Sequence, residues 1–540
     1  MSAPISELTS WNADWKGLRV VVLGLAQTGF SVADTLTELG AEVLVATETA
    51  AEEYASLLPV IGADLHVGPL DAVPDRITEF GPDVIVASPG FAPGHPVVRW
   101  ALEASVPLWG DIELAWRVRD KVVRADGSSA DWILITGTNG KTTTTRLTAT
   151  MLVEGGLRAA PCGNIGVPVL DAIRDPAGFD ALVVELSSHQ LWYLSLAEAE
   201  GQPFPLASVC LNLADDHLEW HGTFDAYREA KAVVYRNTRV ACVYNKADVA
   251  TREMVEDAEV VEGARAIGFD LGVPGPSDVG IVDGILVDRA FLEERRSSAL
   301  ELTTLDRLAS VGLIAPHIVS NILAASALSR AAGVEPAAIR DALDTFRLDP
   351  HRIEVVAHHA GVTWVDDSKA TNPHAAASSL SAYPGAIWVV GGLLKGVDIG
   401  PLVAGRGSAV KAAIVIGRVR DDVVAAFARH APDVPVFEVE HGETEEVMRR
   451  VVQRAAGIAT SGDVVLLAPA SASFDQFSGY AERGTRFAEA VREHVEGLDP
   501  ERDDTESERD VTRPDRHEAQ AGETDGDSDA DTPPAGGATA

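Results

Sequence analysis

The sequence predicts an α/β protein with several domains built on mostly parallel sheets. Strand-like apolar runs alternate with helical patterns in three regions, which begin near residues 18, 132 and 349. The middle region also carries a glycine-rich turn between its first strand and its first helix. Alternation of this kind is typical of parallel strands joined by helices. A chain of 540 residues is long enough for about three or four such domains.

Composition and charge exclude some classes of function. With 46% hydrophobic and 23% charged residues, the chain has the composition of a globular protein with sizeable cores. The formal net charge of −37 argues against nonspecific binding to nucleic acid or to anionic lipid. If the substrate is anionic, Lys, Arg and Mg²⁺ in the site must offset the repulsion from the negative net charge.

Cysteine usage and the chain start point to a reducing compartment. Cys162, Cys210 and Cys242 are too few for a disulfide framework, and the last two lie in apolar, strand-like runs. The first residues lack a basic segment followed by an apolar run, so we expect no secretory signal. No run of about 18 apolar residues occurs. We therefore expect no membrane insertion and a cytoplasmic location. We also expect a monomer.

The first region begins with a strand, a glycine turn, a helix and a second strand. The strand at 18–24 runs into a G-x-x-x-x-G turn at 24–29, and a helix precedes the strand at 43–45. This turn alone is a weak signal, and a nicotinamide dinucleotide or another nucleotide diphosphate fits it. Another strand is predicted at 83–87, residues 110–114 close the region, and residues 120–131 form a polar linker.

The turn of the second region is typical of a phosphate-binding loop. It follows an apolar strand at 132–135 and precedes a helix. Its residues are Gly137, Thr138, Asn139, Gly140, Lys141, Thr142 and Thr143. Backbone N–H groups and the helix N-terminus bind polyphosphate in such loops, the lysine reaches the β- and γ-phosphates, and the next hydroxyl can ligate Mg²⁺. The spacing is one residue shorter than the usual G-x-x-x-x-G-K-[ST] pattern, and the alternative is a surface turn.

Polar residues follow the later strands of this region, which are predicted at 181–186, 207–213 and 240–244. Ligands of open α/β sheets bind at the carboxyl ends of strands. Glu185 and His217 are therefore candidate ligands of Mg²⁺, with Asp216 as an alternative. Each alone is more often an ordinary loop residue, but together they favour a site. Lys231 lies on a following helix, and by itself it is typical of a solvated lysine.

The rest of the chain divides into three parts. Residues 249–305 are predicted to form short strands and loops, and the following helix contains Asn321. A second dinucleotide-fold-like unit begins near residue 349, with strands at 362–365, 386–390, 412–416 and 464–467. From residue 498 the composition predicts a disordered acidic tail, because large apolar residues are almost absent. A solvated tail and an interaction tail both fit this composition.

Several motifs together resemble the Mur ligase family, whose members add amino acids to the peptide of the peptidoglycan precursor. They include the phosphate loop, G-N-I-G at 163–166, E-L-S-S at 185–188, D-H at 216–217 and A-K at 230–231. D-D-S-K-A-T-N at 366–372 and A-P-A-S-A-S-F-D-Q-F at 468–477 resemble the D-glutamate-adding branch. The resemblance covers the chain up to about residue 495.

The resemblance implies three domains and a reaction. It implies a Rossmann-like UDP-substrate domain at 1–128, a central P-loop ATPase domain with a mostly parallel sheet at 129–348, and a Rossmann-like amino-acid domain at 349–497, followed by the tail at 498–540. ATP and two Mg²⁺ ions would convert the carboxylate of UDP-N-acetylmuramoyl-L-alanine to an acyl phosphate. The amine of D-glutamate would then attack it.

The same resemblance implies roles for individual residues. Lys141, Thr142, Glu185, His217 and Lys231 match catalytic or metal positions, and the family carbamylates the lysine at the last of these. Asn321, Arg352 and Asp367 match ATP-binding positions. Thr28, Asn164, Ser187 and Ser188 match positions near the nucleotide-sugar substrate and its phosphates. Lys369, Thr371, Lys395, Ser473 and Tyr480 match the D-glutamate pocket.

The sequence departs from the family's pattern at a few positions. Thr47-Glu48 stands where an acidic residue and then Thr-Arg are common, and Gln27-Thr28 stands in place of Leu-Thr. His189 occupies a position expected to be apolar or aromatic, and Tyr480 one expected to be Phe.

Two alternatives remain open on the sequence. The first is another amide ligase of the superfamily, such as an L-alanine or diaminopimelate adder or a folylpolyglutamate synthetase. The second is a nucleotide-binding scaffold without catalysis.

Overall fold

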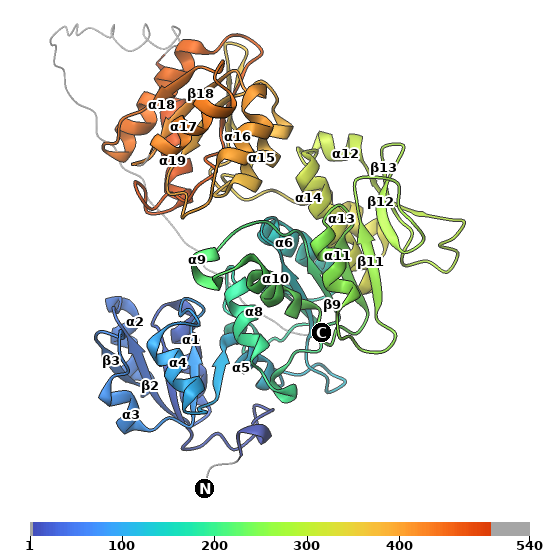
Figure 1. The fold of residues 1–540 in the computed structure, drawn as a ribbon. Coiled ribbons are helices and arrows are strands. Elements are labelled where there is room, and N and C mark those ends of the chain that lie inside the picture. The colour runs from blue at the N-terminus through green and yellow to red at the C-terminus, as the bar shows by residue number, and fades with distance from the viewer. Residues whose placement is uncertain (1–3, 419, 498–540) are drawn as a thin grey trace, which may run out of the picture. The chain divides into compact units, whose positions relative to one another are not determined.

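The strands of the computed structural model form three sheets, which confirms the α/β class (Figure 1). The structure describes residues 4–418 and 420–497. The three sheets take their strands from residues 19–110, 131–304 and 354–467. The described residues up to His494 belong to one compact unit. The acidic tail predicted from residue 498 lies outside the described residues, and the domain boundaries at 128, 348 and 497 stay predictions.

The first sheet has five parallel strands in the order β3-β2-β1-β4-β5. Their bounds are β1 Arg19–Leu23, β2 Glu42–Thr47, β3 Asp64–Val67, β4 Val84–Ala87 and β5 Leu108–Gly110. The helices are α1 Gln27–Glu38, α2 Glu52–Ile61, α3 Asp75–Phe80, α4 Pro96–Glu103 and α5 Asp111–Arg117. Val20, Val21 and Val22 are all buried, as expected for a parallel strand covered on both faces.

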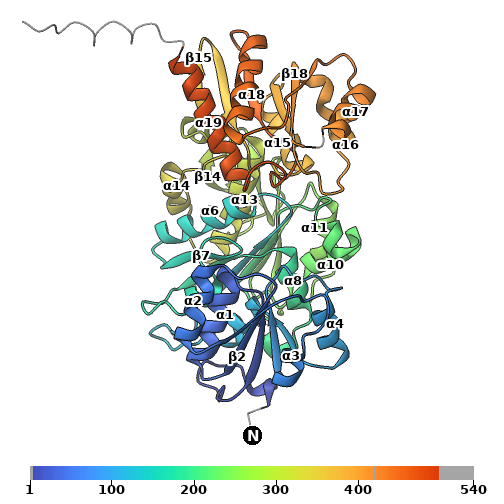
Figure 2. The same cartoon turned by 90° about the vertical axis from the view of Figure 1, so that its left-hand side faces the viewer.

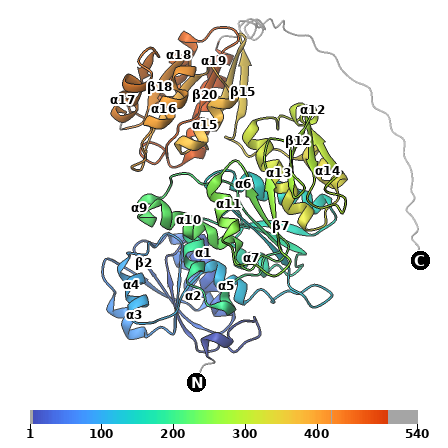
Figure 3. The ribbon, with the colours of Figure 1, turned by 45° about the vertical axis from the view of Figure 1, so that its right-hand side comes forward.

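The second sheet has nine strands in the order β14-β13-β12-β11-β10-β9-β6-β8-β7, and among the described strands β13 pairs antiparallel with both of its neighbours, β12 and β14, while the other pairs are parallel. The bounds are β6 Asp131–Thr136, β7 Ala159–Gly163, β8 Ala181–Glu185, β9 Ala207–Cys210, β10 Ala241–Asn245, β11 Arg265–Phe269, β12 Asp278–Val282, β13 Ile285–Asp288 and β14 Leu300–Thr304. Its longest helices, α6 (Lys141–Glu154) and α13 (Pro316–Ala331), share one hydrophobic core with these strands (Figure 3).

Seven further helices belong to this part of the chain. They are α7 Val169–Ile173, α8 Ser188–Ser195, α9 Leu218–His221, α10 Phe224–Ala232, α11 Val249–Glu256, α12 Leu305–Ser310 and α14 Pro336–Thr345. The expectation of only short strands and loops at 249–305 was wrong for α11. Asp248 caps this helix, because its carboxylate accepts hydrogen bonds from the backbone N–H of Ala250 and Thr251.

The third sheet has the order β15-β16-β20-β17-β18-β19, with β15 antiparallel to β16 and the other pairs parallel. The bounds are β15 Glu354–His359, β16 Val362–Asp366, β17 Ile387–Gly391, β18 Ala412–Ile416, β19 Val436–Glu438 and β20 Val464–Leu467. The helices are α15 Pro373–Ala382, α16 Gly400–Arg406, α17 Asp421–His430, α18 Thr444–Ile458 and α19 Tyr480–Glu496. Ion pairs join the neighbouring helices α18 and α19 (Figure 2).

The first and second sheets share a hydrophobic core. Trp109, Ile112 and Trp116 belong to the same buried cluster as Trp132 and Leu191. A polar bond crosses this core, since the buried Gln190 donates from Nε2 to Oδ2 of the buried Asp111 at 2.8 Å. The segment 118–130, predicted as a linker from 120 to 131, has no helix or strand, and Asp131 already belongs to β6. The chain is thus irregular here although the core is continuous.

Candidate active site

The phosphate loop between β6 and α6 has the backbone that its glycines predict. Gly137 and Gly140 have φ of 150° and 85°, and Lys141 begins α6. A Cβ atom on Gly140 would lie 2.5 Å from Oδ1 of Asn321, so α13 packs directly against the loop. Nζ of Lys141 donates hydrogen bonds to the carbonyls of Gly137 at 2.8 Å and Thr138 at 3.0 Å. Burial lowers the pKa of Lys141, and the nearby Glu185 and Asp216 carboxylates oppose this.

Lys231 lies against the same loop from helix α10. Its side chain is 1% exposed, and Nζ donates to Oγ1 of Thr136 at 3.1 Å and to the carbonyl of Gly137 at 2.9 Å. Burial, with the nearby Lys141 ammonium, lowers the pKa of Lys231 to about 7. A neutral amine is therefore accessible near neutral pH, which a solvated lysine would not offer.

Glu185 at the end of β8 has one carboxylate oxygen without a partner. Oε1 accepts a hydrogen bond from Nδ2 of Asn164 at 2.9 Å, whereas Oε2 is buried and has no hydrogen-bond partner among the described residues. Such an orphaned oxygen needs an explanation, and a hard divalent cation supplies one. This oxygen and the hydroxyl of Thr142 are donors of the kind that Mg²⁺ binds, and His217 stays a predicted ligand.

His217 lies in a left-handed turn, with φ of 53°, at the start of α9. Its Nε2 lies 3.7 Å from Oδ2 of Asp216. The ring of His189 packs edge-on against it, with ring centres 4.7 Å apart, and also lies 4.5 Å from the Trp220 ring. Burial, with His217 and His221 nearby, lowers the pKa of His189 to about 3. His189 is therefore neutral and packs as an aromatic ring, which accounts for its place at a position expected to be aromatic.

Ser187 and Ser188 make hydrogen bonds within the protein. Ser187 Oγ caps α8 by accepting from the N–H of Gln190 at 3.1 Å, and Gln190 Oε1 accepts from the N–H of Ser187 at 3.0 Å. Ser188 Oγ is 2.9 Å from Nε2 of His221. Sequence reasoning missed Gln190, although Ser followed three residues later by Gln is a capping-box signal.

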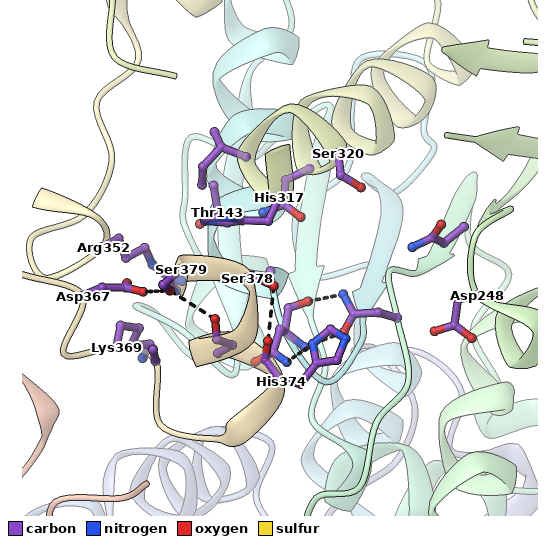
Figure 4. Close-up of a pocket in the computed structure, with 18 of the residues that line it drawn as sticks. Thr143, Asp248, His317, Ser320, Arg352, Asp367, Lys369, His374, Ser378 and Ser379 are labelled. Atoms are coloured by element: carbon purple, nitrogen blue, oxygen red, sulfur yellow. Dashed lines mark hydrogen bonds between the residues drawn. The ribbon is translucent and has the colours of Figure 1, made fainter. Parts of the chain in front are cut away.

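A cavity of about 450 Å³ adjoins the phosphate loop (Figure 4). Seven predicted residues line it, namely Asn139, Gly140, Thr143, Asn321, Arg352, Asp367 and Lys369. Gly137, Thr138, Lys141 and Thr142 are not among its lining residues. Arg352, Asp367 and Lys369 contribute one wall, and His317 on α13 contributes another. Burial raises the pKa of Asp367 to about 6.

Sequence reasoning missed several residues of this cavity, among them Asn245, Asp248, His317 and Ser320. Nδ1 of His317 is buried without a hydrogen-bond partner in the described part of the chain. Burial lowers the pKa of His317 to about 4, so the imidazole is neutral at pH 7. The four residues sit at a strand end, at a helix cap and on α13, where the sequence carries no phosphate-loop pattern.

A second cavity of about 200 Å³ contains most of the predicted amino-acid pocket. Thr371, Lys395, Ser473 and Tyr480 line it together with Asp216, His217, Ala472 and Phe474. Lys369 lines the larger cavity, but its Nζ lies 3.7 Å from the centre of the Tyr480 ring. The five predicted residues are thus brought together beside His217. Phe474, which is 67% exposed, was not predicted.

Two residues predicted near the nucleotide-sugar substrate and its phosphates, Thr28 and Asn164, are not brought into these cavities. Thr28 lies in the first turn of α1, next to Gln27, whose Nε2 donates to the carbonyl of Gly166 at 3.3 Å. Thr47 is buried and donates from Oγ1 to the carbonyl of Thr49 at 2.7 Å. Neither Thr28 nor Asn164 lines either cavity.

His351 fixes the segment that carries Arg352. Its ring Nδ1 lies 2.6 Å from Oδ2 of Asp366, and its backbone N–H donates to Oε2 of Glu354 at 2.9 Å. These three residues are close enough to hold a metal ion. Their mutual hydrogen bonds already account for the arrangement.

Comparison with known proteins identifies the class. Three family models match in chain order: the Mur ligase MurD-like N-terminal domain at 18–110, the Mur ligase middle domain at 135–329, and the Mur ligase glutamate ligase domain at 351–471. Together with the relatives below, they show that the chain belongs to the Mur ligase family.

Curated relatives narrow the class to one branch. The chain is 63% identical over 91% of its length, and 96% of the relative's, to the UDP-N-acetylmuramoylalanine–D-glutamate ligase of Leifsonia xyli subsp. xyli. It is 47% identical to the ligase of the same name from Tropheryma whipplei and 46% identical to that from Streptomyces avermitilis, over 91% and 89% of this chain and 99% of each relative.

Solved structures with low identity share the fold. A pseudomurein peptide ligase type C from Methanothermus fervidus matches with a TM-score of 0.52 at 16% identity, over 88% of this chain and 100% of the other. The UDP-N-acetylmuramate-alanine ligase of Thermotoga maritima matches with a TM-score of 0.51 at 18% identity, over 88% of this chain and 99% of the other.

Proposed function

We propose that this protein is an ATP-dependent ligase that joins D-glutamate to the L-alanine carboxylate of UDP-N-acetylmuramoyl-L-alanine, a step in peptidoglycan precursor synthesis. One observation carries the proposal. The cavity beside the phosphate loop and the smaller cavity with Lys395 are both lined from the segment 367–371, and His217 lines the second. A nucleotide and an anionic amino acid can therefore be held close to one another. The name of the 63% identical relative, UDP-N-acetylmuramoylalanine–D-glutamate ligase, supports the same reaction.

The reaction consists of two transfers. The substrate carboxylate attacks the γ-phosphorus of ATP, which gives an acyl phosphate and ADP. The amine of D-glutamate then attacks the acyl carbon, loses a proton, and inorganic phosphate leaves from the tetrahedral intermediate. Bringing a carboxylate to a triphosphate juxtaposes anions, so positive groups are needed where the charge develops.

The phosphate loop supplies part of that charge. The N-terminal end of α6 would bind the polyphosphate through its free backbone N–H groups, and Lys141 adds an ammonium group. Hydrogen bonds to the loop carbonyls keep this ammonium at the loop. Thr142, Glu185 and His217 would hold Mg²⁺, which neutralises phosphate charge when bound; two ions are proposed.

The smaller cavity suits an amino acid with two carboxylates. Lys369 and Lys395 place two ammonium groups at or beside it, and Thr371 and Ser473 add hydroxyl groups. Charge-assisted hydrogen bonds from two cations match D-glutamate better than L-alanine, which has a single carboxylate.

Lys231 is proposed to be carbamylated. Carbon dioxide adds to the neutral amine with loss of a proton, which converts a buried cation into a carboxylate-like group. The pKa of about 7 and the nearby Lys141 both favour this change. The product would add an oxygen ligand beside the residues that would hold Mg²⁺.

A phosphate-release assay tests the proposed function. Purified protein receives ATP, Mg²⁺, UDP-N-acetylmuramoyl-L-alanine and one amino acid from a panel of D-glutamate, L-glutamate, L-alanine and diaminopimelate. We expect release only with D-glutamate, and a product whose mass equals that of the two substrates joined with loss of water. The Lys141→Ala variant is the control for contaminating activity. Release with another amino acid, or none with any, would refute the proposal.

The proposed location is the cytoplasm and the proposed state a monomer. The three cysteines are all free and buried, as is usual in a reducing compartment. Within the described ranges, no helix combines the length and apolar character that crossing a bilayer requires.

A further inference from the structure

Lys369 stands at the boundary between the two cavities. Its side chain lines the larger cavity beside the phosphate loop (Figure 4). Its ammonium nitrogen lies 3.7 Å from the centre of the Tyr480 ring, and Tyr480 lines the smaller cavity. A flexible lysine at this place can reach either the phosphates of a nucleotide or the carboxylate of an amino acid. A neighbouring group that holds the ammonium nitrogen would determine which of the two cavities it serves.

The backbone of Tyr480 is hydrogen-bonded to the segment that carries Lys369. Oγ of Ser368, the residue before Lys369, donates to the carbonyl of Tyr480 at 2.7 Å. Arg483, which is 1% exposed, donates from Nε to Ser368 Oγ at 3.0 Å and from Nη2 to the Ser368 carbonyl at 2.8 Å. The start of α19 and the segment after β16 are therefore tied together, so the backbones of Tyr480 and Lys369 stay close to one another.

The aromatic ring is the partner that holds the ammonium group. Among the residues that the structure describes, Lys369 forms no ion pair with a carboxylate, so its charge stays available for an incoming anion. A cation over the face of an aromatic ring is attracted without being neutralised. The ring can thus hold the ammonium group at the amino-acid side while leaving its N–H donors free.

We propose that Tyr480 is a positioning residue that keeps the Lys369 ammonium at the smaller cavity, where it binds a carboxylate of D-glutamate. The inference rests on the proposed function, because it assumes that D-glutamate is the second substrate. The ring face performs this role, so the hydroxyl that distinguishes Tyr480 from phenylalanine is dispensable for it.

Two substitutions at Tyr480 separate the ring from the hydroxyl. Tyr480→Leu removes the ring face and keeps apolar bulk, and we expect it to raise the KM for D-glutamate about tenfold, within the range of a partly desolvated cation–ring contact. The KM for ATP should stay within about twofold. Tyr480→Phe keeps the ring face, so its KM for D-glutamate should stay within about threefold of the parent value.

A matched control removes another ring from the same part of the fold. Phe437 on β19 lies beneath Arg454, with the guanidinium carbon 5.1 Å from the ring centre. Phe437→Leu should leave both KM values unchanged. Thermal unfolding of the three variants separates a general loss of stability from the loss of lysine positioning. If Tyr480→Leu does not fold, Tyr480→Met gives the same comparison.

Each outcome decides the inference. Equal KM values for the Leu and Phe variants would overturn it, as would a rise in the KM for ATP that equals the rise for D-glutamate. The same kinetic change in Phe437→Leu would also overturn it. If the parent enzyme itself shows no D-glutamate-dependent phosphate release, the proposed function fails. If the unsubstituted enzyme releases phosphate with D-glutamate but the variants have the same KM values as that enzyme, only the role proposed for Tyr480 is refuted.

Discussion

Lys231 illustrates how a single residue acquires a function from its surroundings. Its hydrogen bonds go to a hydroxyl and a carbonyl rather than to a carboxylate, and a second lysine lies nearby. A permanent cation at this place is expensive, whereas a carbamate would be attracted by Lys141. The site is therefore suited to a modified lysine more than to a free one.

Substitution of Lys231 should abolish turnover and allow chemical rescue. We expect Lys231→Ala to lower kcat by about 10²-fold or more, because a charged group at the reacting phosphates is lost. Added acetate or formate should recover part of the rate, since a short carboxylate fits the vacated space. Steady-state assays with and without the acid measure this effect. A near-normal rate for Lys231→Ala would contradict the role, and Lys231→Arg, which cannot form a carbamate, should show no rescue.

Asp111 provides a prediction about stability and pH. Burial raises the pKa of this carboxyl from 3.8 to about 6, although Gln190 donates a hydrogen bond to it. The folded state therefore holds the proton more tightly than the unfolded state. The stabilisation of the protonated form is complete below about pH 4, is lost as the pH rises through 6, and is absent above it.

The Asp111→Asn variant should consequently be more stable than the parent at pH 8. A shift of about two pH units corresponds to about 3 kcal/mol, and about half of this difference should remain at pH 5. Urea unfolding at the two pH values measures the free energies. Asp14→Asn, a substitution of an exposed side chain, is the control and should give no difference. An Asp111→Asn variant that is less stable at pH 8 would show that the charge itself is required.

The sequence could predict which residues of the proposed amino-acid pocket lie near one another, but not the buried contacts that hold such residues in place. Lys369, Lys395 and Ser473 follow β16, β17 and β20, which are neighbours in one sheet, so strand-end reasoning and the family motifs place them together. The pairing of Asp111 with Gln190 joins residues 79 positions apart, and no periodic pattern encodes which buried polar groups meet. The contact of Lys369 with Tyr480 could not be predicted from the sequence for the same reason.

At the scale of elements, the sequence predicted most strands and the phosphate loop but missed a capped helix. Apolar strand runs are strong signals because both faces of a parallel strand are buried. Helix α11 is short and has only Thr251 and Met254 buried, so its periodic pattern is weak. Its signal was the single capping residue Asp248, which also lines the larger cavity. A prediction of site residues from strand ends therefore misses residues that cap helices, such as Asp248.

The phosphate loop gives a prediction at this scale through the glycines that flank α6. Gly140 and Gly156 have φ of 85° and 83°, but only at Gly140 would an added Cβ atom meet a close neighbour, Oδ1 of Asn321 at 2.5 Å. Gly140→Ala should therefore displace the Asn321 side chain, which lines the larger cavity, strain the loop backbone and weaken ATP binding. Gly156→Ala should cost about 1 kcal/mol of stability from backbone strain and keep ATP binding. Isothermal titration with ATP compares the two variants, and retained affinity in Gly140→Ala would refute the role of this close approach.

At the scale of the whole molecule, two kinds of contact join the three sheets. The first and second sheets share a continuous apolar core in which Trp116 packs edge-on against Trp132, with ring centres 5.2 Å apart. The contacts of the phosphate loop with the segment after β16 are polar instead. Oδ1 and Nδ2 of Asn139 bond reciprocally with the amide of Asn372, at 3.0 and 3.3 Å, and Arg146 pairs with Asp349. Polar contacts exchange with water more readily than an apolar core does, so we expect ligand-driven movement at the second junction rather than the first.

A double-mutant cycle on the amide pair tests this expectation. Asn139→Ala removes one partner. Asn372→Ser removes the other while keeping a side-chain oxygen for the N–H of Ala375, which Asn372 caps at 2.9 Å. Because Asn139 lines the proposed ATP cavity, each substitution should raise the KM for ATP about three- to tenfold. The KM of the double variant should not exceed the higher of the two single-variant KM values. Additive effects would show that the two amides act independently, and X-ray scattering curves that do not change on adding ATP and substrates would exclude closure at this junction.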